Sequence, residues 1–144
     1  MSNEFFSPTS ADVVLEPGTV PAQWMLGGQP QTRSKLLGRT PDRLAFVMLW
    51  ECGAVSFKWY YSRDEVFIGL SGEAFMIDEK GGERRFGPGD VALFPAGSHA
   101  TWRIPDHFRK VAFLKDPVLP PAALVLKAWN RLLQMIGLRE KSPF

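Results

Sequence analysis

Few residue types that commonly carry catalysis or bind metals occur in this chain at a useful spacing. There are two histidines, His99 and His107, and one cysteine, Cys52. A lone cysteine excludes an internal disulfide and a cysteine-cluster zinc site. Ser98 and His99 are adjacent, and neighbouring side chains on a strand point to opposite faces, so they do not indicate a catalytic triad. No glycine-rich phosphate-binding motif is present either.

Aromatic residues at alternating positions are the more informative feature. Because side chains alternate across a strand, residues two positions apart share a face. One such set is Phe57, Trp59 and Tyr61, and another is Ala100, Trp102 and Ile104. Each set therefore presents aromatic surface on one side of its strand.

The elements that must position these residues are short strands separated by turn signals. The expected strands are 44–50, 57–61, 66–70, 73–78, 84–86, 91–94, 99–104 and 109–114. Turns are predicted at 80–82 and 86–90, where Gly and Pro set the backbone angles. Residues 24–43 are interpreted as a long loop or edge segment, and residues 1–23 as an N-terminal arm with a short strand at 13–15. The pattern predicts an all-β sandwich or barrel.

The C-terminal residues 117–144 form a different region, in which 122–138 is predicted to be a helix with Pro121 near its first turn. Its polar residues occupy a sector of only about 100° at 3.6 residues per turn; they are Lys127, Asn130, Arg131 and Gln134. The wide apolar surface favours contact with a second copy of the chain, hence a homodimer. Capping of its own barrel and a membrane-surface role are the alternatives, the latter weakened because the polar face has only two cations.

Two segments resemble the two conserved motifs of the cupin family. Residues 53–72 have the spacing of the first motif and residues 89–100 that of the second. Further similarity covers 28–37, 49–53, 59–65, 72–81, 86–90, 94–102 and Arg109-Lys110, and it points to the ureidoglycine-aminohydrolase-like and ethanolamine-utilisation-like branch. The resemblance implies a small double-stranded β-helix, the RmlC-like jelly-roll barrel, over residues 24–116. The arm and the C-terminal helix lie outside it.

The resemblance also implies a metal site, and here the sequence departs from the family. The positions of the two first-motif histidines are occupied by Trp59 and Tyr61, and the second-motif histidine position by Ala100; only the glutamate, Glu65, is kept. Since such sites use three or four protein ligands, no metal cofactor is expected. His99 is next to the ligand position but should point to the opposite face.

The same alignment places the aromatic faces inside the barrel. The expected cavity wall consists of Trp59, Tyr61, Glu65, Phe67, Ala100 and Trp102. Two interpretations remain open: the side chains fill the barrel, or they bind a small, amine- or ureido-containing metabolite. In the second, Glu65 is a counter-charge or an acid–base catalyst; in the first, it bonds to Tyr61 or pairs with Arg103 or Arg109. The scattered basic residues Arg84-Arg85, Arg103 and Arg109-Lys110 are interpreted as solvated faces rather than a phosphate-binding track.

Composition narrows the function classes. The 17 basic and 15 acidic residues give a net charge of +2, which argues against a nucleic-acid partner. The longest wholly apolar run, 44–50, is far too short to span a membrane, and the N-terminus lacks signal-peptide features, so a cytoplasmic protein is expected. The alternatives to a metabolite-binding protein are a metal-dependent ureidoglycine-aminohydrolase-like enzyme and an interaction protein assembling through its helix.

Overall fold

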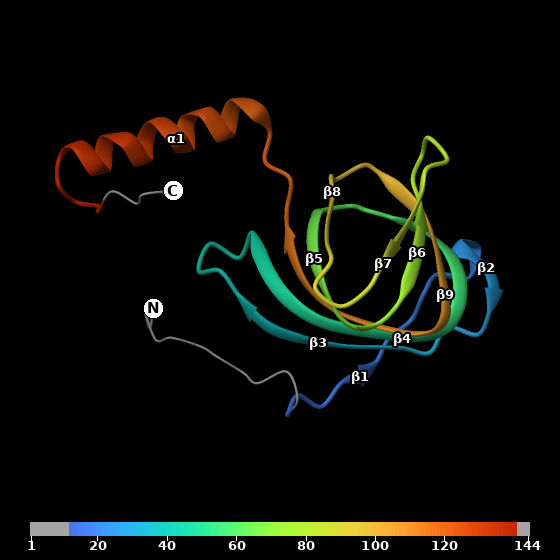
Figure 1. Ribbon diagram of the computed structural model, residues 1–144. Coiled ribbons are helices and arrows are strands. Elements are labelled where there is room, and N and C mark those ends of the chain that lie inside the picture. The colour runs from blue at the N-terminus through green and yellow to red at the C-terminus, as the bar shows by residue number, and fades with distance from the viewer. Residues whose placement is uncertain (1–11, 141–144) are drawn as a thin grey trace.

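The computed structural model describes residues 12–140, in which nine strands form one antiparallel sheet that curls into a barrel (Figure 1). The strands are β1 (Glu16–Pro17), β2 (Met25–Gly28), β3 (Thr32–Arg39), β4 (Ala45–Tyr60), β5 (Asp64–Gly72), β6 (Ala74–Ile77), β7 (Glu83–Phe86), β8 (Val91–Phe94) and β9 (His99–Lys115). The main path of pairing is β1-β3-β4-β9-β5-β8, with β2 on β4 and with β6 between β7 and β9. The expected all-β barrel is confirmed.

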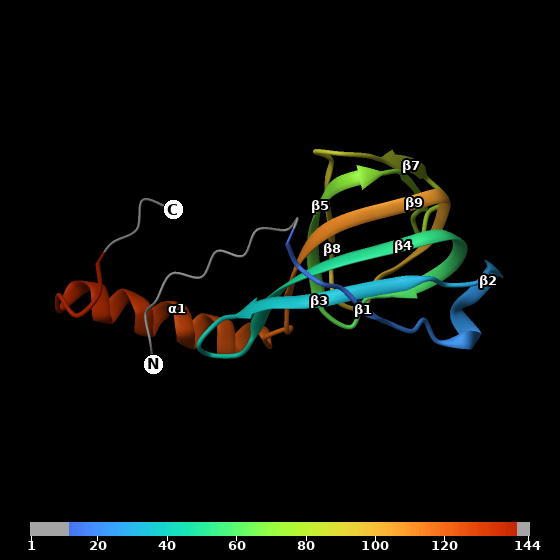
Figure 2. The same cartoon turned by 90° about the horizontal axis from the view of Figure 1, so that it is seen from below.

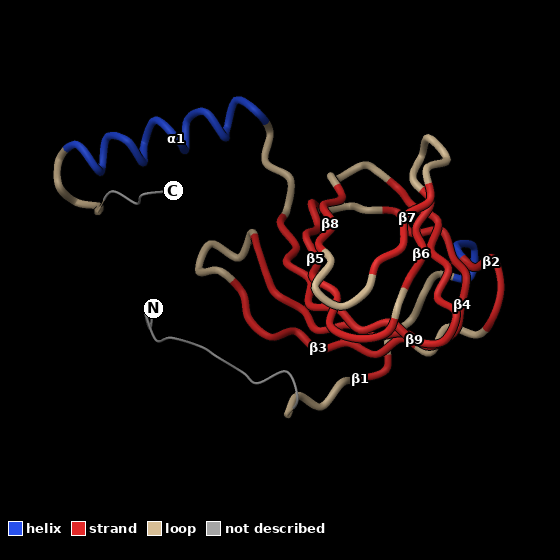
Figure 3. Tube along the Cα trace, in the orientation of Figure 1, coloured by secondary structure: helices blue, strands red, loops and turns tan. Residues whose placement is uncertain are grey.

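Two long strands, β4 and β9, form the frame of the barrel, and each replaces two strands expected from the sequence. They pair with each other from Ala45↔Lys115 to Tyr60↔His99, with one irregularity between Gly53 and Val55. Gly53 lies opposite His107, so the two breaks implied by the expected strand bounds, 51–56 and 105–108, both fall at this bulge. A bulge bends a ribbon and tolerates Pro without ending it. The expected breaks are therefore bends within continuous strands, which curve around the barrel in Figure 3.

The region expected to be a long loop or edge segment, residues 24–43, contains strands β2 and β3, and a 3-10 turn at Ala22–Trp24 precedes them. The arm pairs with β3 through β1, which lies at 16–17 instead of the predicted 13–15. Beyond β1, the Gly18 amide donates to the Thr32 carbonyl at 2.8 Å. Thus the arm covers the outer edge of β3 at residues 32–34.

Close backbone approach fixes the end of β5. Gly72 has φ +71°, and a Cβ there would lie 2.0 Å from the carbonyl oxygen of His107. The amide of the next residue, Glu73, donates to this same carbonyl at 3.0 Å. Only glycine allows this contact between β5 and β9.

The helix α1 (Pro120–Met135) extends away from the barrel, as Figures 1 and 2 show. It confirms the predicted C-terminal helix, although it begins and ends two to three residues earlier. None of its residues is buried. Among residues 12–140, no helix is long and apolar enough to cross a membrane.

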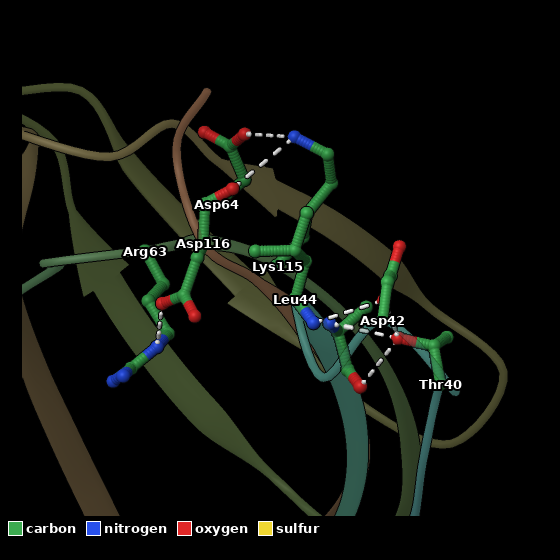
Figure 4. Close-up of polar contacts among 8 residues, drawn as sticks. Thr40, Asp42, Leu44, Arg63, Asp64, Lys115 and Asp116 are labelled. Atoms are coloured by element: carbon green, nitrogen blue, oxygen red, sulfur yellow. Dashed lines mark hydrogen bonds and ion pairs between the residues drawn. The ribbon is translucent and has the colours of Figure 1, made fainter. Parts of the chain in front are cut away.

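Polar contacts hold the point from which α1 departs (Figure 4). The Asp116 amide donates to the Leu44 carbonyl at 2.7 Å, and the Asp116 carboxylate pairs with Arg63. Lys115 lies 3.8 Å from Asp64, and the turn before β4 is closed by bonds between Thr40, Asp42 and Leu44. The chain is thus anchored to the barrel up to Asp116, immediately before Pro117 and the linker to the helix.

Candidate functional site

A cavity of about 220 Å³ lies against the inner face of β3, β4, β5 and β9. Its wall is mainly apolar and aromatic, with a carboxylate and an ammonium group at one place. The lining residues are Gly18, Thr19, Thr32, Ser34, Met48, Trp50, Phe57, Trp59, Glu65, Trp102, Lys110, Ala112 and Leu114. Such a pocket, apolar with a few converging polar groups, is the usual form of a small-molecule site.

The two charged groups of the cavity form an ion pair with each other. Lys110 Nζ donates to Glu65 Oε1, and the two side chains are only 8% and 6% exposed. Lys110 comes from β9, opposite Trp50 of β4, and Glu65 comes from the start of β5. Burial of either charge alone would be costly, so the pair is what allows both to remain inside.

Aromatic rings surround the ammonium group. Lys110 Nζ lies 4.7 Å from the ring centroids of both Phe67 and Trp102, and 5.1 Å from that of Trp50. Cation–π attraction in such a desolvated place adds to the ion pair. The positive charge is therefore fixed in position at the wall of the cavity.

A second buried polar contact joins Trp102 to Tyr61. The indole Nε1 of Trp102 donates to the Tyr61 hydroxyl oxygen at 3.0 Å, and the Tyr61 ring stacks on Phe94 with centroids 4.3 Å apart. Burial, and secondarily the negative charge of Glu65, raise the pKa of Tyr61 well above its ordinary value of 10.0. Tyr61 is therefore a neutral phenol at physiological pH.

The partner of Glu65 differs from the arginines expected from the sequence. Arg103 is exposed and lies 3.9 Å from Glu83, and Arg109 pairs with Glu51 at 3.0 Å. The interpretation of Arg109-Lys110 as a solvated face is wrong for Lys110. Its position is explained by strand alternation, because Phe108, Lys110 and Ala112 face inward and the residues between them face outward.

A second hollow, of about 280 Å³, adjoins the first and shares with it Trp59, Glu65 and Leu114. Trp24 and Tyr61 contribute to its wall, and the Trp24 ring contacts Trp59 edge to face at 5.1 Å. Trp59 and Glu65 therefore stand between the two spaces.

The structure brings together only part of the wall expected from the sequence. Trp59, Glu65 and Trp102 line the main cavity, and Tyr61 lines the adjoining hollow. Phe67 and Ala100 are both fully buried and line neither space. The Phe67 ring packs on that of Trp102, with centroids 5.8 Å apart.

Sequence reasoning missed the lining residues from β3, β4 and the end of β9, above all Trp50 and Lys110. Alternation would have placed Trp50 on the same face as Met48 and Cys52. It also missed Thr32, which is 5% exposed. Within residues 12–140, its hydroxyl is the one wholly buried side-chain polar atom that lacks a hydrogen-bond partner.

Comparison with known proteins agrees with this architecture. The chain is similar to a structure from Pseudomonas syringae pv. tomato, a protein of unknown function in the DUF861 family (18% identity, TM-score 0.68, covering 74% of this chain and 46% of that one). It is also similar to a putative ethanolamine utilization protein Q from Salmonella typhimurium (22% identity, TM-score 0.53, 59% and 69% covered). A third is the polyketide cyclase RemF from Streptomyces resistomycificus (17% identity, TM-score 0.62, 81% and 83% covered).

A family model described as the EutQ-like cupin domain matches residues 40–112, just over half of the chain. This chain belongs to that family. The cupin spans about half the length of the Pseudomonas protein. At these identities the solved structures show the fold alone. No curated protein is significantly similar in sequence.

The donor set of this cupin does not fit the divalent metal that many cupins hold. Trp59 and Ala100 offer no lone pair, and the Tyr61 oxygen already accepts the Trp102 indole proton. The remaining ligand, Glu65, is bound to an ammonium group that would repel a cation. His99 points away from the cavity and contacts Glu79 at 3.1 Å, and residues 12–140 contain no group of three His, Cys, Asp or Glu that could hold a metal ion.

Proposed function

We propose that this cupin binds a small, neutral, planar organic molecule in its aromatic cavity, and that it does so without a metal ion. The observation that carries the proposal is the Glu65–Lys110 pair, buried at the wall of the cavity among tryptophan rings. The pair supplies a fixed hydrogen-bond donor beside a fixed acceptor. The chemistry of the ligand follows from this juxtaposition.

The two charges at the cavity wall favour a neutral ligand. The carboxylate and the ammonium compensate each other, so a charged ligand would bring an uncompensated charge into a desolvated space. An alkylammonium compound, in particular, would compete with Lys110 for Glu65. A carboxamide or ureido group, in contrast, has a carbonyl that accepts from Lys110 Nζ and an N–H that donates to Glu65.

Size and shape limit the ligand further. A cavity of about 150 Å³ holds benzene, and this one measures about 220 Å³. One substituted ring or an equivalent planar group therefore fits. The indoles of Trp50, Trp59 and Trp102 provide stacking and edge contacts for such a molecule.

The test is a thermal-shift and calorimetric screen of the full chain against matched sets of single-ring compounds. Each ring is offered as a carboxamide, a urea, an amine and a carboxylate. We expect the neutral carboxamides or ureas to raise the melting temperature and the matched amines and carboxylates to leave it unchanged. No shift with any neutral compound, or a preference for the amines, would overturn the proposal.

Three variants locate the binding. Trp59→Leu removes an indole from the wall, and Glu65→Gln replaces the acceptor; each should weaken binding at least tenfold. Phe75→Leu is the matched control, because Phe75 packs under Arg103 and lines neither space. Binding that persists in Trp59→Leu but is lost in Phe75→Leu would place the ligand elsewhere.

Acid–base catalysis by Glu65 is a second candidate, favoured by the direct contact of a carboxylate and an ammonium group at the cavity wall. Lys110 can give a proton to a carbonyl oxygen while Glu65 takes one from an adjacent N–H or C–H. Turnover or solvent-deuterium exchange of a bound compound would support this role. Glu65→Gln and Lys110→Met should then abolish the exchange, whereas Trp59→Leu should only weaken binding.

A further inference from the structure

Helix α1 presents a broad apolar surface on which none of residues 12–140 packs closely enough to bury a side chain. Six large side chains of the helix and its C-terminal cap lie within an arc of about 140° at 100° per residue; they are Leu124, Val125, Trp129, Leu132, Met135 and Ile136. Their exposure ranges from 46% for Leu132 to 80% for Met135. An isolated helix of this length is marginal in water, so its stability requires packing.

A second apolar surface covers the outer face of the sheet β4-β9-β5-β8. The register aligns two neighbouring rows across the four strands. The first row is Val47, Phe113, Val66 and Leu93, and the second is Val111, Ile68 and Val91. Leu49, which continues the second row on β4, is fully buried and adds no exposed surface. Charged pairs flank the rows, Lys115–Asp64 at one end and Arg109–Glu51 at the other. Leu93 is 64% exposed and Val91 54%. Large apolar side chains that lie side by side on one face are seldom so exposed on a monomer.

The helix does not cover this sheet in its own chain. It follows β9 after the linker 116–119, whose first residue is anchored by Arg63 and Leu44 and whose second is Pro117. Figure 1 shows α1 directed away from β5 and β8, and Figure 2 shows the same separation from a second direction. The described part of the chain thus carries two apolar surfaces, one on a helix and one on a sheet, that do not cover each other.

We propose that two copies of this chain associate about a two-fold axis, with α1 of each copy lying on the outer face of β9, β5 and β8 of the other. A helix on a sheet face is a standard packing of secondary structure. The helix is long enough, because 16 residues extend about 24 Å, whereas the three strands span about 10 Å plus their side chains. Since each copy supplies both surfaces, the contact closes as a dimer.

The area suffices for a stable dimer. Each copy contributes the six helix side chains together with Ile68, Val91, Leu93 and Phe113. At about 50 Å² of exposed apolar area per side chain, these residues bury roughly 500 Å². Homodimer interfaces are about 65% apolar, so the whole contact would approach the roughly 800 Å² per partner of a stable complex. A membrane surface is the less suitable occupant, because α1 has only Lys127 and Arg131 as cations.

Sedimentation and light scattering of the full chain over a range of concentrations test the assembly. The wild type should be a dimer, and both Leu93→Glu on the sheet and Trp129→Glu on the helix should raise the dissociation constant at least tenfold. The controls, Arg84→Glu on the exposed strand β7 and Gln134→Glu on the polar side of α1, should remain dimeric. A monomeric wild type, or a dimer insensitive to both substitutions, would overturn the proposal. If a glutamate variant loses its native circular dichroism, the Leu93→Ser and Trp129→Ser variants make the same comparison.

Disulfide trapping tests which copy the helix contacts. In a Cys52→Ala background, Leu93→Cys chains are mixed with Leu132→Cys chains and oxidised. Covalent heterodimers are expected. The double variant Leu93→Cys/Leu132→Cys should likewise give linked dimers; an internally linked monomer would mean that α1 folds onto its own sheet and would refute the exchange. Co-sedimentation of a monomer with phosphatidylglycerol vesicles would instead make a lipid surface the occupant.

Discussion

Proteins usually keep charged side chains outside and large apolar side chains inside. The interior of this barrel and its outer surface each depart from that rule. Inside, Glu65 and Lys110 place two charges among aromatic rings. Outside, Leu93 and Trp129 are more than half exposed on surfaces without charge of their own. The interior charges compensate each other, whereas the exterior apolar groups have no partner among residues 12–140. The inner polar contacts should therefore decide whether the chain folds, and the outer apolar surfaces should decide what it joins.

The largest expected effect comes from breaking the inner ion pair. Lys110→Ala leaves Glu65 charged and unpaired in a desolvated place and should lower the free energy of unfolding by about 3–5 kcal/mol. The exposed pair Lys35–Glu16 is the matched control, since Lys35→Ala should cost less than about 1 kcal/mol. Urea denaturation measures both.

The double variant Glu65→Gln/Lys110→Met separates the effect of the unpaired charge from the effect of the lost side-chain volume. It removes both charges, so it should recover most of the stability that Lys110→Ala loses. If Lys110→Ala is no less stable than Lys35→Ala, the buried ion pair matters no more for stability than the exposed one, and the prediction is wrong.

A smaller effect is expected at the hydroxyl of Tyr61. Tyr61→Phe leaves the buried indole N–H of Trp102 without its acceptor and should lower the free energy of unfolding by about 1–3 kcal/mol. The neighbouring Tyr60 is 45% exposed, so Tyr60→Phe should cost less than about 0.5 kcal/mol. Denaturation gives the two values, and the Trp102 indole proton resonance should shift in Tyr61→Phe alone. Equal losses in the two variants would contradict the buried hydrogen bond.

Alkaline pH should lower the free energy of unfolding by an amount comparable to the effect of Tyr61→Phe or smaller. Cys52 is 2% exposed, and burial raises the pKa of its thiol from 9.0 to about 11. The folded state therefore holds this proton between pH 9 and pH 11 while the unfolded state releases it, and stability falls as the pH rises through that window. Between pH 8 and pH 10 the loss should be about 1 kcal/mol.

The Cys52→Ala variant shows how much of the pH dependence of stability is due to the thiol. Its free energy of unfolding should be nearly independent of pH between 8 and 10, because Tyr61 contributes only above the ordinary tyrosine pKa of 10.0. Urea denaturation at pH 8, 9 and 10 gives both slopes. An equally steep decline in the variant would assign the pH dependence to another group.

The sequence predicted the parts of the fold that depend on local periodicity. Alternation gave Phe57 and Trp59 a common face and Trp102 a defined face on its own strand. The family resemblance implied that these faces point inward, and the structure confirms this placement. Family resemblance predicted the barrel. The strand bounds were less accurate, because Gly53 and Pro105 end strands in most contexts but here lie at a bulge. Whether a turn signal ends a strand or bends it depends on the strand opposite.

The candidate site was harder to predict, since its defining pair is 45 residues apart in sequence. A buried lysine is rare, and Lys110 follows an arginine that does reach a surface partner. Alternation puts the two side chains on opposite faces of β9 but does not show which face is the inner one. Their difference arises from the register of β9 against β4, which aligns Lys110 with Trp50 and Arg109 with Glu51. Likewise, the unpartnered rows outside the barrel become visible only after four strands are placed in order.

The smallest effect on folding, and the sharpest contrast with the interior, is expected at Trp129. This side chain is 56% exposed, so Trp129→Ser should change the free energy of unfolding of the monomer by less than about 0.5 kcal/mol. Dimerisation adds a concentration-dependent stability by mass action. The melting temperature of the wild type should therefore rise with protein concentration, while that of Trp129→Ser should not. Calorimetry at two protein concentrations that differ 100-fold measures the difference. If the melting temperature of Trp129→Ser also rises with concentration, the exposed helix is not what joins the two copies.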